Sequence, residues 1–198
     1  MPDGSHTFLF MDLVGFTALT AERGDENAAE VALRLFERIR HVLPEHSGEE
    51  IKTIGDAMMV RCEDPREGVE LGLRISEQIG EQPDLPPLRI AVHTGTAVSR
   101  GGDWYGSAVN VAARLCSAAG GDEVLVSEAT REAAACLEDV EFGARQLHWL
   151  KNVPDPVAAR LAARGERKSA RRPLRELARL PIGRGFCGVP LRHSEVTG

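Results

Sequence analysis

The chain has 198 residues, of which 42% are hydrophobic, and this size and composition fit one ordinary domain with a substantial core. No apolar run approaches the ~18 residues of a membrane-spanning helix, so no transmembrane segment is expected. The four cysteines show no C-x-x-C spacing and the N-terminus carries no targeting signal, which favours a cytoplasmic protein with reduced thiols.

The formal net charge of −6 is unevenly distributed along the chain. Residues 1–159 hold 14 Lys and Arg against 27 Asp and Glu, whereas residues 160–198 hold 10 against 3. An acidic core argues against nucleic-acid binding, because nucleic-acid interfaces are basic. We expect a folded domain over residues 1–161 and a basic, flexible tail over residues 162–198. Docking of this tail on the acidic domain or on another anionic surface is the alternative.

The expected elements follow the order of a β-α-β-β-α-β core. Apolar runs and alternation predict strands at residues 7–13, 50–54, 57–62, 88–93, 124–126, 140–150 and 157–161, with a short return strand at residues 97–99. Helical periodicity predicts helices from residue 16 and at residues 25–42, 65–80, 107–119 and 127–136. The predicted fold class is therefore α/β, with a ferredoxin-like βαββαβ sheet that carries its helices on one face.

Two aspartates lie at the ends of apolar strands. Asp12 belongs to the run F-M-D-L-V-G-F-T, and Asp56 follows K-T-I-G in a turn. If the two strands are neighbours, the carboxylates converge at one edge of the sheet, where hard oxygen ligands suit Mg²⁺ or Mn²⁺. The residues alone also allow purely structural roles, in which Asp12 caps a helix and Asp56 is an ordinary turn residue.

The residues after Asp12 favour the metal-site interpretation. Gly15 lets the backbone approach a ligand closely. Phe16 and Thr17 then begin the predicted helix, whose free N–H groups favour a phosphate. We expect these three residues to contribute to binding a polyphosphate.

A third segment, D-W-Y-G-S-A-V-N-V-A-A-R at residues 103–114, follows the strand predicted at residues 88–93. In order and spacing the three segments resemble the catalytic domain of class III nucleotidyl cyclases, with the patterns F-x-D-x-x-G-F-T, K-x-x-G-D and D-x-x-G-x-x-V-N-x-A-x-R. The resemblance extends from about residue 7 to about residue 161 and implies the class III cyclase fold. Because only six residues precede the first strand, we also expect a free-standing catalytic domain.

The resemblance assigns roles to residues at both ends of a nucleotide. It implies that Asp12, Asp56 and the main-chain carbonyl of Leu13 hold two Mg²⁺ or Mn²⁺ ions. It also implies that Lys52 donates to the adenine ring and that Asp103 accepts from the exocyclic amine. This pair favours ATP, since guanine presents the opposite hydrogen-bonding pattern and guanylyl cyclases of the family usually carry Glu and Cys or Ser there.

Two further groups follow from the resemblance. Asn110 and Arg114 stand four residues apart on one helix face, and they would orient the ribose and stabilise charge on the α-phosphate. Without the resemblance, these two residues would be interpreted as part of a solvent-exposed helix face. Lys151 would reach the terminal phosphates, although Asn152 stands where the family usually has glycine.

The sequence thus predicts an adenylate cyclase that converts ATP into 3′,5′-cyclic AMP and pyrophosphate. The resemblance also implies a head-to-tail homodimer, in which one protomer supplies the metal aspartates and its partner the base-reading residues, the asparagine and the arginine. Two alternatives stay open: a nucleotide-binding regulatory domain without turnover, and a guanylate cyclase.

Overall fold

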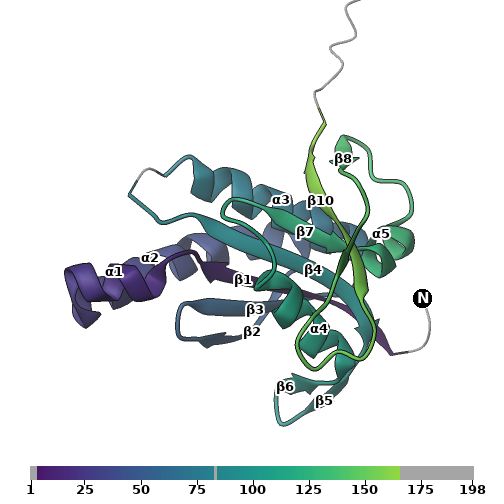
Figure 1. Ribbon diagram of the computed structural model, residues 1–198, viewed down its shortest axis with the longest axis horizontal. Coiled ribbons are helices and arrows are strands. Elements are labelled where there is room, and N and C mark those ends of the chain that lie inside the picture. Colours follow the sequence, from purple (N-terminus) through teal and green to yellow (C-terminus); the bar gives the residue numbers. More distant parts are fainter. Residues whose placement is uncertain (1–3, 83, 166–198) are drawn as a thin grey trace, which may run out of the picture. The chain divides into compact units, whose positions relative to one another are not determined.

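The computed structural model describes residues 4–82 and 84–165, which form a central β-sheet covered by helices (Figure 1). The main sheet has the strand order β2-β3-β1-β4-β7-β10-β8, and β9 pairs with β10. Its strands are β1 (Ser5–Leu13), β2 (Glu49–Ile54), β3 (Ala57–Cys62), β4 (Leu88–Thr96), β7 (Val124–Ser127), β8 (Val140–Phe142), β9 (Gln146–His148) and β10 (Val157–Arg164). All pairings in this sheet are antiparallel except that of β4 with β7.

The helices and the small second sheet complete the described chain. The helices are α1 (Phe16–Arg23), α2 (Asp25–Val42), the 3₁₀ turn Leu43–His46, α3 (Pro65–Gly80), α4 (Ser107–Cys116) and α5 (Glu128–Ala134). Strands β5 (Val98–Arg100) and β6 (Asp103–Tyr105) pair only with each other. No helix within residues 4–82 and 84–165 combines the length and the apolar character needed to cross a membrane.

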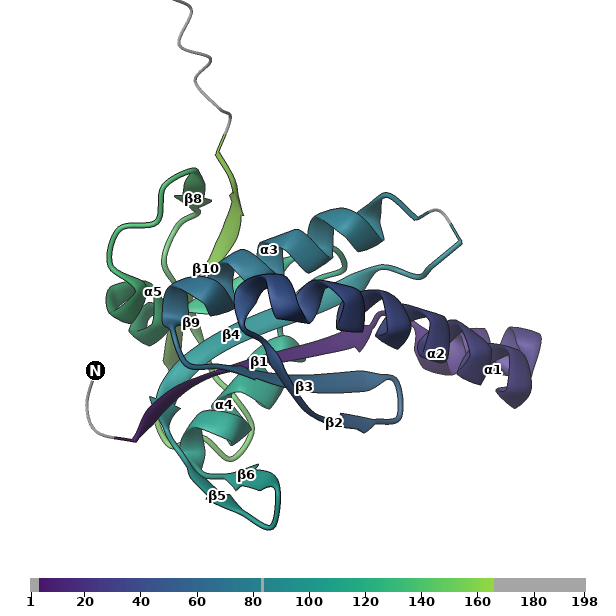
Figure 2. The ribbon, with the colours of Figure 1, turned by 180° about the vertical axis from the view of Figure 1, so that it is seen from behind.

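The predicted α/β fold class is confirmed, because β1-α2-β2-β3-α3-β4 gives the expected β-α-β-β-α-β order. The prediction that all helices lie on one face is wrong. Helices α2 and α3 cover one face of the sheet (Figure 2), whereas α4 covers the other (Figure 1). The apolar stripe of α4 predicts that the helix is buried, but it carries no information about which face of the sheet it covers.

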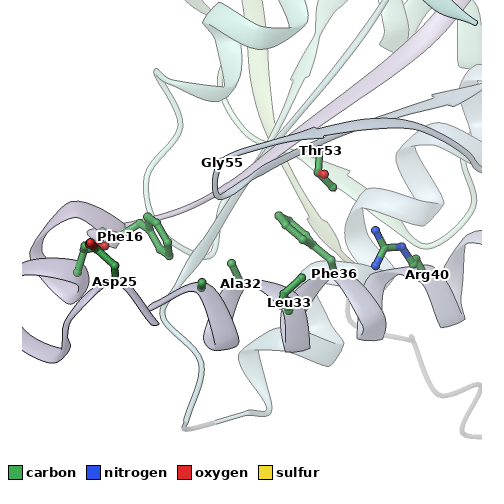
Figure 3. Close-up of a pocket in the computed structure, with 10 residues that line it drawn as sticks. Phe16, Asp25, Ala32, Leu33, Phe36, Arg40, Thr53 and Gly55 are labelled. Atoms are coloured by element: carbon green, nitrogen blue, oxygen red, sulfur yellow. The ribbon is translucent and has the colours of Figure 1, made fainter. Parts of the chain in front are cut away.

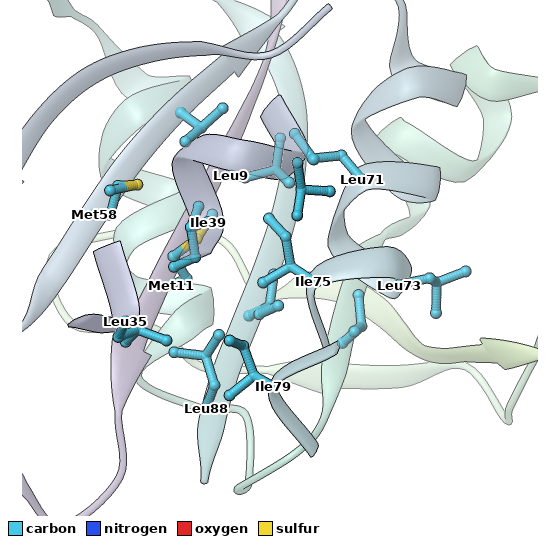
Figure 4. Close-up of a cluster of buried hydrophobic side chains, with 14 of the residues drawn as sticks. Leu9, Met11, Leu35, Ile39, Met58, Leu71, Leu73, Ile75, Ile79 and Leu88 are labelled. Atoms are coloured by element: carbon cyan, nitrogen blue, oxygen red, sulfur yellow. The ribbon is translucent and has the colours of Figure 1, made fainter. Parts of the chain in front are cut away.

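Strand β1 supplies side chains to both cores, because successive residues of a strand point to opposite faces. Leu9 and Met11 enter the cluster under α2 and α3, which Figure 4 shows. Phe8 and Phe10 instead pack with the apolar face of α4. Strand β1 therefore lies at the centre of the domain, between β3 and β4, and its end is held on both sides.

Several boundaries differ from those expected. Strand β10 continues through Arg164, past the expected domain end at residue 161, because Arg164 pairs with Val140 of β8. The Arg164 guanidinium also forms ion pairs with Glu70 and, at 3.2 Å, with Glu77 on α3. The remainder of the predicted tail, residues 166–198, lies outside the described residues.

Strand β6 escaped prediction because it has only three residues, too few for a periodic signal. The strand predicted at residues 140–150 is divided into β8 and β9. Helix α4 also ends earlier than predicted, at Cys116 rather than at residue 119.

Candidate active site

Asp12 lies near the end of β1, paired across the sheet with Ala57 of β3 on one side and Arg89 of β4 on the other. Pairing on both sides fixes the backbone at this position. Asp12 is two residues from Phe10 and four from Phe8, so its side chain points to the same face of the strand. That is the face of the sheet that α4 covers. The carboxylate is 20% exposed, which leaves it accessible at the rim of the core.

Asp56 occupies the two-residue turn between β2 and β3, next to Ala57, the cross-strand partner of Asp12. Burial and the nearby negative charge of Asp12 raise the pKa of the Asp56 carboxyl. The structure therefore brings together the two aspartates that the sequence predicts to converge. The turn requires Gly55, which has a φ of 62°, in the left-handed region.

The Asp12–Asp56 pair fits a hard divalent cation. The two carboxylates and the nearby carbonyl of Leu13 offer oxygen ligands, which Mg²⁺ and Mn²⁺ prefer. Burial and the charge of Asp12 disfavour the ionised form of Asp56 and so raise its pKa, and a dication bound beside it would favour that form. Within the residues that the structure describes, no group of three or more His, Cys, Asp or Glu side chains could hold a metal ion, so this site would rely on two carboxylates and a main-chain oxygen.

Arg89 is a site residue that sequence reasoning missed. Its Nε donates to Oδ2 of Asp12 at 2.9 Å, and its Nη2 contacts the same oxygen. The guanidinium thus lies where a polyanion held by metals at Asp12 would approach. No local pattern in the sequence points to Arg89, because its position opposite Asp12 depends on the register of β1 with β4 in the folded sheet.

The loop after β1 has the backbone expected for a phosphate-binding turn. Gly15 precedes α1 with a φ of 78°, and Thr17 is exposed in the first turn of α1. Among the side chains that the structure describes, none caps the N-terminus of α1, so its first N–H groups are not taken by a cap. The Phe16 ring packs against the core cluster under α2, so any phosphate contact of Phe16 would involve its main-chain N–H.

A cavity of about 440 Å³ lies between α1, α2 and the β2–β3 hairpin (Figure 3). Phe16 and Gly55, the residue before Asp56, line one end of the cavity, while Arg40 lines it farther along α2. Its walls are otherwise mostly apolar, with Leu33 and Phe36 among them. This composition does not suit a triphosphate, so the cavity is not a candidate phosphate site.

Lys52 and Asp103 meet, although they are far apart in the sequence. Nζ of Lys52 on β2 donates to Oδ2 of Asp103 on β6 at 2.6 Å. This hydrogen bond lowers the pKa of Asp103, so the carboxylate is charged and remains an acceptor. Both side chains are about one-third exposed or less, at 34% and 26%, which leaves their polar ends within reach of a ligand.

Asn110 and Arg114 are exposed side by side on α4. The opposite face of the helix, including Val111, Ala112 and Leu115, is buried against the sheet. The two polar side chains therefore point away from the sheet, and away from Asp12 of the same chain. Within residues 4–82 and 84–165, no hydrogen bond or ion pair joins them to the aspartate pair.

Lys151 is exposed in the loop between β9 and β10. Asn152 follows with a φ of 61°, the left-handed conformation in which asparagine can replace glycine. The main-chain N–H of Val153 closes the turn by donating to the carbonyl of Leu150 at 3.2 Å. The turn thus forms without the usual glycine, while no hydrogen bond or ion pair among the described residues links Lys151 to the aspartates.

Comparison with known proteins identifies the family. The model of the adenylate and guanylate cyclase catalytic domain matches residues 2–153. Over 127 residues the chain is 42% identical to a pH-sensitive adenylate cyclase of Mycobacterium tuberculosis; the match covers 64% of this chain and 32% of that protein. The chain therefore spans about a third of the length of this curated relative.

Solved structures agree on the fold. Adenylate cyclases from Trypanosoma brucei in their monomeric state include a chain that is 21% identical with a TM-score of 0.71, over 82% of this chain and 89% of that one. The adenylyl cyclase CyaB from P. aeruginosa is 22% identical with a TM-score of 0.66, over 82% and 95%. With a family model that matches most of its length, the chain belongs to the adenylate and guanylate cyclase catalytic domain family.

Proposed function

We propose that this chain is an adenylate cyclase that converts ATP into 3′,5′-cyclic AMP and pyrophosphate. The observation that carries the proposal is the convergence of Asp12 and Asp56 at the end of β1, beside a glycine-initiated helix. The curated relative with 42% identity is an adenylate cyclase, which supports the same reaction for this chain.

The aspartates would bind the catalytic metals, with the Leu13 carbonyl as an additional ligand. Two Mg²⁺ or Mn²⁺ ions bound there would lower the pKa of the ribose 3′-hydroxyl and neutralise the triphosphate. The N–H groups after Gly15 would donate to phosphate oxygens. Arg89, already beside Asp12, is placed to exchange that carboxylate for a phosphate oxygen, because a guanidinium forms strong paired hydrogen bonds with either anion.

The Lys52–Asp103 pair would select adenine. Lys52 is a donor only, and the charged Asp103 is an acceptor only. Adenine offers a ring acceptor and an amine donor, which satisfies both groups. Guanine would oppose an N–H to the lysine and a carbonyl to the aspartate, leaving two polar groups without partners in a partly enclosed site.

The complete site would be shared between two protomers. In one chain, Asn110 and Arg114 project from the side of α4 that faces away from the sheet and from Asp12. A head-to-tail homodimer would bring them to the aspartates of the partner and would generate two equivalent sites. Arg114 would stabilise the charge that develops on the α-phosphate, and Asn110 would orient the ribose. Lys151 would approach the terminal phosphates from its exposed turn.

The competing function is a regulatory domain that binds nucleotide without turnover. Calorimetry with ATP and Mn²⁺, run beside an assay for cyclic AMP, separates the two. Binding together with product supports the cyclase proposal. Saturable binding with no cyclic product at any metal concentration would support the regulatory alternative.

Purine preference supplies an independent prediction. The wild-type chain should use ATP in preference to GTP. The double change Lys52→Glu and Asp103→Cys should lower kcat/KM for ATP by about 10²-fold or more, since it removes both hydrogen bonds to adenine. The measurement is kcat/KM for each nucleotide. Equal use of both by the wild type would show that these residues do not read the base.

Truncation tests whether the catalytic unit ends with β10. A chain ending at Gly165 should remain folded and active, because every candidate site residue and all of β10 are retained. A matched chain ending at Leu161 should lose stability, since it removes the pairing of Ala162–Arg164 with β8 and the ion pairs of Arg164 with α3. Thermal unfolding and cyclic AMP formation check both. Loss of activity in the chain that ends at Gly165 would show that part of residues 166–198 belongs to the working enzyme.

A further inference from the structure

Asp103 lies on a hairpin with little backbone support. Strands β5 and β6 have three residues each and pair only with each other, not with the main sheet. Two-stranded hairpins of this size have little stability of their own. The orientation of Asp103 therefore depends on side chains that attach the hairpin to the rest of the domain.

Trp104 provides this attachment. Its ring centroid lies 5.7 Å from that of Phe8, which is fully buried in the core, and 4.3 Å from that of His6. The Arg61 guanidinium carbon lies 4.8 Å from the Trp104 ring centroid, in cation–π contact. The indole is thus held against β1 and β3 of the main sheet by three side chains.

Arg61 is itself held in place. Its Nε donates to Nδ1 of His6 at 3.2 Å, and its Nη atoms form ion pairs with Glu49 and Glu63 at 2.8 Å. The Arg61 side chain is only 12% exposed. Every guanidinium nitrogen is engaged, so the cation over the indole has little freedom to move.

The same tryptophan residue holds the Asp103 carboxylate. The main-chain N–H of Trp104 donates to Oδ1 of Asp103 at 2.8 Å, while Lys52 donates to Oδ2 at 2.6 Å. Because only two rotatable bonds separate the indole from the backbone of Trp104, a fixed indole restricts how far this N–H can move. The two carboxylate oxygens then have separate partners, and the carboxylate plane is defined.

We propose that Trp104, clamped by Arg61, His6 and Phe8, positions Asp103 and thereby sets the selectivity between ATP and GTP. The inference rests on the proposed function, since it concerns how its base-reading pair discriminates. A fixed acceptor opposes the guanine carbonyl, which is repulsive. A hairpin free to move lets Asp103 withdraw from that carbonyl and also weakens its contact with the adenine amine. Loosening Trp104 should therefore reduce selectivity and not merely reduce activity.

The test is the ratio of kcat/KM for ATP to kcat/KM for GTP. Trp104→Leu should lower this ratio by about tenfold, roughly the effect of losing one ordinary hydrogen bond. Trp104→Phe keeps an aromatic ring in the clamp and should retain most of the selectivity. Arg61→Met, which leaves the hairpin sequence intact, should lower the ratio in the same direction. Arg34→Met is the matched control, because Arg34, on α2, forms only an exposed ion pair with Asp84 in the loop before β4.

Each outcome has one consequence. A lowered ratio in Trp104→Leu and Arg61→Met, with Trp104→Phe and Arg34→Met near the wild type, supports the positioning role. Equal losses for both nucleotides, with the ratio unchanged, would overturn it even if activity falls. Should Trp104→Leu fail to fold, as judged by circular dichroism, the Arg61→Met ratio decides alone. A wild type without cyclic product or purine preference would instead overturn the proposed function on which the inference rests.

Discussion

Replacing Asp12 or Asp56 with asparagine should abolish cyclic AMP formation and leave the domain folded. Asparagine keeps the shape of each side chain but removes the charge that would bind the metals. Loss of one preorganised charge contact typically lowers the rate by ~10²–10³-fold, and loss of a catalytic metal lowers it further. The measurement is the initial rate of cyclic AMP formation from ATP across a range of Mn²⁺ concentrations.

The matched control is Asp84→Asn. Asp84 also pairs with an arginine, but its side chain is 51% exposed, and the residue lies in the loop before β4. This variant should retain near-normal activity, because exposed ion pairs contribute little. Near-normal activity in either active-site variant, with the fold verified by thermal unfolding, would refute metal binding by the aspartate pair.

Mixing two inactive variants should restore activity if the site is shared. A heterodimer of Asp12→Asn and Arg114→Ala has one site with both lesions and one with neither. After random subunit exchange about half of the dimers are mixed, so the expected activity is about one quarter of the wild type. The assay measures cyclic AMP formation after the two purified variants have exchanged subunits.

The control mixture combines Asp12→Asn with Asp56→Asn. Both changes lie in the half of the site that one protomer supplies, so each site of their heterodimer keeps one lesion. This mixture should stay inactive. If heterodimers form, as shown by mass spectrometry of differently tagged chains, and the first mixture stays inactive, the shared-site geometry is wrong.

The sequence predicts the convergence of Asp12 and Asp56 because each carboxylate is tied to the end of a strand with a clear apolar pattern. Arg89 donates a hydrogen bond to Asp12 at 2.9 Å, yet the sequence does not reveal this contact. Its position depends on the alignment of β1 with β4, and that register is a property of the folded sheet. Local sequence patterns predict where strands form, whereas contacts between strands can be predicted only when the pairing of those strands is known.

The same limit applies to Lys52, Asp103 and Trp104. The resemblance to cyclases predicts that the first two act together, and the structure brings them within 2.6 Å. The aromatic clamp around Trp104 could not be predicted, because it joins β6 to residues of β1 and β3 that are distant in the sequence. Likewise, the periodicity of α4 predicts a buried face without specifying which side of the sheet it covers.

The central claim, that this chain cyclises ATP, is tested most directly by identifying the products. The purified chain is incubated with ATP and Mn²⁺, and the nucleotides and pyrophosphate are quantified by chromatography. We expect 3′,5′-cyclic AMP and pyrophosphate in equal amounts, with none formed by Asp12→Asn. Bound but unchanged ATP, or hydrolysis to ADP or AMP without cyclic product, would contradict the claim.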